Sequence, residues 1–209
     1  FRSELDTPGH SIHDVWIEDG IAYSSNWADG IVAVDIGAKK HKESDRSKSQ
    51  FNPLLAKAGQ GSPSNPVKLA EMKDPTGRNH AAFPYLNEET GQFYIIGGDE
   101  NFPWGVQATK NKPSNPRGGY HFMNFTDPNN PREDAIYEVP EAGSHNLWIY
   151  GDILLAGNYQ GGLRIVDISG ELLGDIYKQG REIAHYLSYH KDGRIPNAPR
   201  SEEHTSELQ

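Results

Sequence analysis

Apolar and polar residues alternate in short runs along most of the chain, and turn-forming residues interrupt these runs every few positions. In residues 145–150, His-Asn-Leu-Trp-Ile-Tyr, the alternation predicts a β-strand with apolar side chains on both faces. Other elements must then cover both faces of the sheet to which this strand belongs. Tight turns separate it from two further predicted strands, at 153–158 and 162–168.

The sequence of this three-strand unit is repeated in the chain. Residues 13–37 align with residues 145–169 without a gap, and nine of the 25 positions are identical. The identical pairs are His13/His145, Trp16/Trp148, Ile17/Ile149, Ile21/Ile153, Asn26/Asn158, Gly30/Gly162, Val34/Val166, Asp35/Asp167 and Ile36/Ile168. A third, stretched copy starts at His80 and continues in residues 118–128, where Gly119, Met123 and Asn124 match Gly162, Val166 and Asp167.

Fourth strands are predicted at 66–74 and 133–141, whereas residues 170–184 have apolar spacing that suits one or two helical turns. Repeated four-stranded units that bury both faces against their neighbours are blades of a β-propeller. A β-sandwich, the alternative, would show no such internal repeat. We therefore predict an all-β fold: a partial β-propeller of about three four-stranded antiparallel blades of a larger ring, starting near residues 13, 80 and 145.

The run Gly-Leu-Arg-Ile-Val-Asp-Ile-Ser at 162–169 resembles the LVIVD-repeat family of bacterial and archaeal β-propellers. The segments GDENFP (98–103), YEVPEAGSHNLW (137–148) and GELLGDIYKQGREIA (170–184) are similar to long-repeat members of that family. The resemblance spans roughly residues 5–199 and implies a fold but no settled activity. Because such rings have more blades, we expect residues 1–199 to be a fragment of one β-propeller domain, and the complete protein to be a monomer.

The composition narrows the possible partners. The net charge of −9 and the lack of a basic stripe argue against binding nucleic acid, and no apolar run is long enough to span a membrane. Cysteine is absent, which fits the cytosol and equally an extracytoplasmic protein with a β core. We expect an extracytoplasmic protein, periplasmic, secreted or on the cell surface. Residues 200–209, RSEEHTSELQ, resemble a translated sequencing adapter, so we interpret them as a non-native tail.

Hairpin geometry places the candidate binding residues at one end of the blades. A first strand starts where the second strand ends, so each leading histidine lies beside the residue that closes its hairpin. We expect an arc around the mouth of the central channel, joined by one tryptophan of the loop 101–117. The residues of this predicted ligand-binding site are His13, His80, His145, Asn26, Asp99, Glu100, Asn158 and Trp104.

Other repeated residues have structural interpretations. Trp16, Phe83 and Trp148 occupy one equivalent position and are predicted to pack between blades. Asp35, Asn124 and Asp167 follow third strands, where such side chains bond their own backbone two positions on. The charged loop 38–65 is predicted to lie in solvent on the opposite face.

Two classes of function remain open. The first is a non-enzymatic binding or scaffold module that recognises a protein or polymer at the channel mouth, without a cofactor. The second is a metal-assisted hydrolase or lyase in which His13, His80 and His145 bind a divalent transition metal or act as base. Histidines that instead fasten their own blades by hydrogen bonds would bind no metal. No sequence motif identifies catalytic residues.

Overall fold

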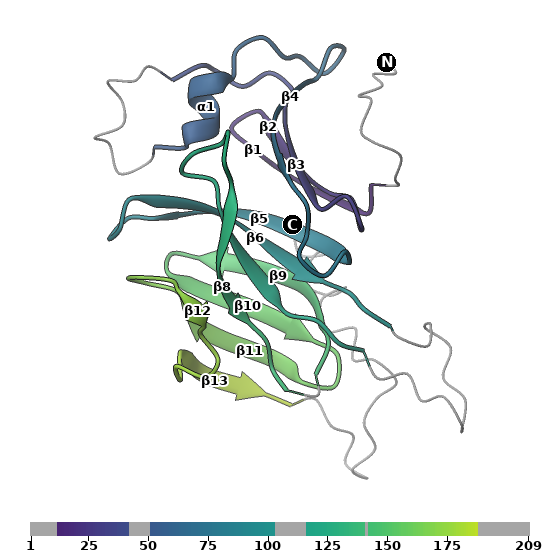
Figure 1. The fold of residues 1–209 in the computed structure, drawn as a ribbon, viewed down its shortest axis with the longest axis vertical. Coiled ribbons are helices and arrows are strands. Elements are labelled where there is room, and N and C mark those ends of the chain that lie inside the picture. The colour runs from purple at the N-terminus through teal and green to yellow at the C-terminus, as the bar shows by residue number, and fades with distance from the viewer. Residues whose placement is uncertain (1–11, 42–50, 103–115, 141, 188–209) are drawn as a thin grey trace.

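The computed structural model describes residues 12–41, 51–102, 116–140 and 142–187. These residues form an all-β protein with three mostly antiparallel sheets, which follow one another in chain order along the long axis (Figure 1). Within the described residues the sheets do not close into a ring. Trp104 and the tail 200–209 lie outside the described residues.

The first sheet has the order β1 (Asp14–Glu18), β2 (Ile21–Ser25), β3 (Ile31–Asp35), β4 (Val67–Met72). The second has the order β5 (Asn79–Asn87), β6 (Gln92–Asp99), β7 (Tyr120–Asn124), β8 (Arg132–Tyr137), β12 (Gly174–Asp175). The third has the order β9 (Ser144–Tyr150), β10 (Ile153–Asn158), β11 (Gly162–Asp167), β13 (Glu182–Tyr186). The strands predicted from the alternation are thus present.

The middle sheet is covered on both faces, as its apolar pattern predicts. Along β6, Phe93 and Ile95 pack into a core shared with the first sheet, whereas Tyr94 and Ile96 pack into a core shared with the third sheet. Strand side chains alternate between faces, so one short strand supplies both cores. The leading strand of the middle sheet, β5, also contacts β1 and β2 of the first sheet and β9 of the third, so it lies between the other two sheets.

A glycine lies at the start of the third strand in every sheet, and the steric reason is the same in all three. A Cβ atom on Gly30 would lie 2.2 Å from the carbonyl oxygen of Met72, and one on Gly162 would lie 2.2 Å from that of Tyr186. At Gly119 the corresponding distance, to the carbonyl oxygen of Tyr137, is 2.9 Å. The repeated glycine therefore lets the end of the fourth strand approach the start of the third.

The polar residues at the ends of the third strands form the predicted turns. The backbone N–H groups of Gly37, Thr126 and Ser169 donate hydrogen bonds, each 2.9 Å long, to side-chain oxygens two residues earlier. The acceptors belong to Asp35, Asn124 and Asp167.

Two sequence predictions were wrong. Residues 170–184 form no helix: β12 pairs in parallel with β8, and β13 completes the third sheet. The loop 38–65 is not wholly in solvent, because α1 (Pro53–Lys57) buries Leu54 and Leu55 in the first core. Because β12 pairs with β8, the middle sheet has five strands rather than the predicted four.

None of the helices in the described parts of the chain is long and apolar enough to cross a bilayer.

Candidate functional site

The leading histidines of the three repeats lie in one row. His13 precedes β1, His80 is the second residue of β5, and His145 is the second residue of β9. The ring centroids of His13 and His80 are 4.0 Å apart, and those of His80 and His145 are 4.2 Å apart. Three residues spaced by more than 60 positions are thereby brought into direct contact, with His80 in the middle.

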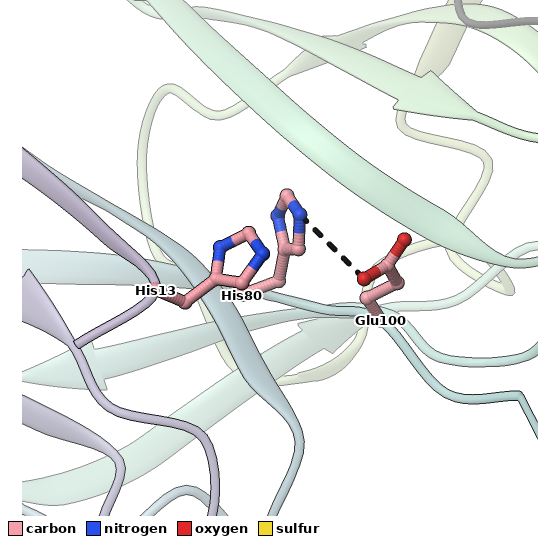
Figure 2. A group of neighbouring side chains, drawn as sticks. All are labelled: His13, His80 and Glu100. Carbon is pink, nitrogen blue, oxygen red and sulfur yellow. Dashed lines mark ion pairs between the residues drawn. The ribbon is translucent and has the colours of Figure 1, made fainter. Parts of the chain in front are cut away.

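Glu100, immediately after β6, faces this row. Its Oε2 atom lies 3.7 Å from His80 Nε2, and its Oε1 atom lies 3.6 Å from His145 Nε2. The Tyr159 hydroxyl donates a hydrogen bond to Oε1. Figure 2 shows His13 and His80 side by side, with the carboxylate of Glu100 beyond them. One donor atom each from His13, His80 and Glu100 lies within 4.8 Å of the other two. We call His13, His80, His145 and Glu100 the histidine cluster.

Aromatic rings flank the histidine cluster. The Trp27 ring contacts His13 edge-on at 4.3 Å between centroids, and the Tyr159 ring contacts His145 at 5.1 Å. Three residues further along the leading strands, a second aromatic layer is formed by Trp16, Phe83 and Trp148, whose centroids lie 4.3 to 5.5 Å apart. These three rings pack together across the sheets, although Trp148 keeps 39% of its surface exposed.

His80 is the most enclosed member of the cluster, with 4% of its surface exposed. Burial, together with the neighbouring His145 and His13, lowers the pKa of His80 to about 2. Its imidazole is therefore neutral at physiological pH. Its Nδ1 atom has no hydrogen-bond partner among the described residues. His13 is exposed and connects the cluster to solvent.

The side-chain amides of Asn26 and Asn158 bond to the backbone at strand ends rather than to the imidazoles. The Asn26 Nδ2 atom donates to the carbonyl oxygens of Ser24 and Gly30, at 3.0 and 3.3 Å. The Asn158 Nδ2 atom donates to the carbonyl oxygen of Ala156 at 3.1 Å. Both side chains are buried, so these two predicted site residues support the backbone beside the cluster.

Asp99, another predicted site residue, belongs to a second group of side chains. Its Oδ2 atom lies 2.9 Å from His121 Nε2, and His121 Nδ1 lies 2.5 Å from Glu133 Oε1. Asp74, from the turn after β4, completes the group: one donor atom each of Asp74, Asp99 and His121 lies within 4.8 Å of the others. We call Asp74, Asp99, His121 and Glu133 the buried acidic cluster.

Electrostatics in the buried acidic cluster favour a positive charge. Burial disfavours the imidazolium, but the hydrogen bonds to Asp99 and Glu133 and the charges of Asp99 and Asp74 outweigh this effect and raise the pKa of His121 to about 9. Burial and the nearby charge of Asp99 raise the pKa of Asp74 above its usual range. The cluster therefore contains more carboxylates than basic groups to balance them.

The sequence prediction missed Asp74, His121, Trp27 and Tyr159. A signal for His121 exists in the repeat: it aligns with Arg164, and both face a glutamate of the fourth strand. His121 faces Glu133, and the Arg164 Nη1 atom lies 3.1 Å from Glu182 Oε1. Asp74 carries no comparable signal, because it lies in a loop between repeats.

No family model, curated protein or solved structure matches the chain. The geometry of the two clusters is thus the basis for any functional assignment.

Proposed function

We propose that the chain is a binding module, formed by three blades of an LVIVD-type β-propeller, that holds a divalent transition metal in the histidine cluster. His13, His80 and Glu100 are the ligands, and the metal presents its remaining coordination position to a donor group of a protein or polymer. In this proposal the module recognises its partner without catalysing a reaction.

The donor set supports this proposal. Two imidazole nitrogens and one carboxylate oxygen suit zinc and neighbouring divalent metals, and zinc sites that bind an exogenous ligand keep one position open. One donor atom from each of the three residues lies within 4.8 Å of the other two, so the three side chains can converge on one ion. His145 faces the other oxygen of Glu100 and, with the Tyr159 hydroxyl, orients that carboxylate.

The observation that carries the proposal is the state of His80. A histidine that fastened its own blade would donate or accept a hydrogen bond with a turn or a neighbouring strand. His80 is buried, yet its Nδ1 has no such partner among the described residues, and its Nε2 lies 3.7 Å from the nearest Glu100 oxygen. An unpaired buried polar atom costs ~1–3 kcal/mol, and a metal bond through the Nδ1 atom would offset this cost.

Zinc titration of the full chain after treatment with a chelator tests the proposal. We expect the parent chain to bind zinc, and we expect either His80→Ala or Glu100→Gln to remove one equivalent of bound metal. Affinity should fall as the pH is lowered, because protons compete with the metal for the imidazole nitrogens. His41→Ala is the control, because this histidine lies outside the cluster.

The proposal is wrong if the parent chain binds no zinc or if both variants retain the full stoichiometry. Circular dichroism of each variant separates loss of a ligand from loss of the fold. A panel of ester and phosphoester substrates, assayed with the zinc-loaded chain, distinguishes the binding module from the metal-assisted hydrolase. We expect no turnover above that of free zinc.

A further inference from the structure

We propose that Asp74, Asp99 and His121 form a second, fully buried site for a divalent metal such as zinc or manganese, which links the first sheet to the second. This site shares no residue with the histidine cluster, and its existence does not depend on the function proposed above.

Three separate segments supply the candidate ligands. Asp74 follows β4 of the first sheet, Asp99 ends β6, and His121 lies in β7, where it pairs with Gly97 of β6. Along residues 99 and 100, successive side chains take different directions: Asp99 joins the buried acidic cluster, whereas Glu100 joins the histidine cluster. The two clusters therefore lie close in sequence but use separate donors.

Burial and unused oxygens distinguish this cluster from a surface group of acids. Asp74, Asp99 and His121 expose only 5%, 0% and 2% of their surface. The Asp74 Oδ2 and Asp99 Oδ1 atoms are buried and have no hydrogen-bond partner among the described residues. The second oxygen of each carboxylate is already held, by Thr76 and Gly77 in one case and by His121 in the other. Each aspartate therefore keeps one unused oxygen, in a place that water does not reach freely.

One basic side chain faces two buried carboxylates. His121 pairs with Asp99, and no lysine or arginine in the described part of the chain forms an ion pair with Asp74 or Asp99. Burying carboxylates with incomplete charge compensation is costly. A divalent cation between Asp74 and Asp99 would replace the proton on His121 Nε2 and compensate both carboxylates.

One ring nitrogen of His121 faces a carboxylate, as is common in histidines that bind a metal through the other ring nitrogen. Metal-binding histidines usually donate the N–H of the other ring nitrogen to a carboxylate or carbonyl group. His121 Nδ1 lies 2.5 Å from Glu133 Oε1, which leaves Nε2 directed at Asp99. On metal binding, Nε2 releases its proton to solvent and its lone pair coordinates the ion, so uptake is coupled to proton release. One imidazole and two carboxylates favour zinc, manganese or iron over softer metals.

Metal counting on the full chain tests this inference. The chain is stripped with a chelator, reloaded with zinc or manganese, desalted and analysed by mass spectrometry of the metal. We expect two equivalents in the parent, one in His80→Ala, one in Asp74→Asn or Asp99→Asn, and none in His80→Ala combined with Asp99→Asn. Metal should raise the melting temperature of His80→Ala but not that of the double variant. Glu71→Gln, which removes an exposed carboxylate, is the control and should retain both equivalents.

Each outcome assigns or removes one site. Two equivalents retained in both Asp74→Asn and Asp99→Asn would overturn the buried site, as would a parent with a single equivalent that His80→Ala abolishes. A single equivalent lost only in the aspartate variants would support the buried site and refute the histidine cluster. X-ray absorption of zinc-loaded His80→Ala provides a test that leaves the buried residues intact. We expect a shell with one imidazole and oxygen ligands, whereas a shell with several imidazoles, or no bound zinc, overturns the inference.

Discussion

Replacing Asp35 by Asn should destabilise the chain far more than the same change at Asp167, the equivalent position of the third sheet. Asp35 Oδ1 accepts hydrogen bonds from the backbone of Gly37 and Ala38, at 2.9 and 2.8 Å. Its Oδ2 accepts three more, between 2.8 and 3.1 Å, from residues 59–61. Asp167, by contrast, accepts from Ser169 alone among backbone N–H groups in the described residues, and 43% of its side chain is exposed.

The expected magnitude follows from these contacts. Burial opposes ionisation of Asp35, but the hydrogen bonds from the backbone of Gly37, Gly61, Ala38 and Gly59 outweigh it and lower the pKa from 3.8 to about 2. This difference corresponds to ~2 kcal/mol of stability at neutral pH. Asparagine keeps only one acceptor oxygen, so its NH2 group faces at least two backbone N–H groups and leaves them without an acceptor. We expect a total loss of about 3–5 kcal/mol for Asp35→Asn and about 1 kcal/mol for Asp167→Asn.

Urea unfolding at pH 7, followed by circular dichroism, measures both losses. The folded-state pKa of Asp35 lies below its unfolded value, so the stabilisation is present above about pH 4 and disappears as the pH falls towards 2. The difference in stability between the parent and Asp35→Asn should shrink over that interval. Equal losses for the two variants, or a difference that does not change with pH, would refute the reasoning.

Two further substitutions test the packing of the sheets. Gly30→Ala should cost at least ~3 kcal/mol in urea unfolding, because the residue has a φ of +77° and its Cβ would collide with the carbonyl oxygen of Met72. Gly151→Ala, with a φ of +56° and open space around it, should cost only about 1 kcal/mol, and similar costs would contradict the steric argument. Tyr137→Phe removes a 2.6 Å hydrogen bond to Glu182 between the second and third sheets and should cost about 1 kcal/mol in thermal unfolding; an unchanged melting temperature would contradict this.

The strands were predictable because each carries its own local pattern. Alternating apolar residues, tight turns and the aspartates at strand ends act over a few positions, so sequence alone locates them. The helix α1 was missed because five residues show no helical periodicity. Residues 170–184 were interpreted as helical from apolar spacing, yet Gly174 and Gly180 adopt a positive φ, and Leu172 and Ile176 pack into the core shared by the second and third sheets.

The histidine cluster was partly predictable for the same reason as the strands. The leading histidines hold equivalent positions in three repeats, so the fold that the repeat implies brings them together, and Glu100 follows from the second hairpin. Asp99 and Glu100 join different clusters because consecutive side chains point in different directions. The alternation rule predicts this divergence, but the sequence prediction did not apply it to these two residues. The buried acidic cluster brings a loop residue, Asp74, close to strands of another sheet, and no local sequence pattern predicts such a long-range contact.

The central claim is that the histidine cluster holds a divalent transition metal. Anomalous diffraction at the zinc edge, from crystals of the full chain grown with zinc, tests this claim most directly. We predict a peak ~2.0–2.2 Å from the imidazole nitrogens of His13 and His80 and from an oxygen of Glu100. A map with no peak at the cluster, or with a peak that does not contact His80, would contradict the claim.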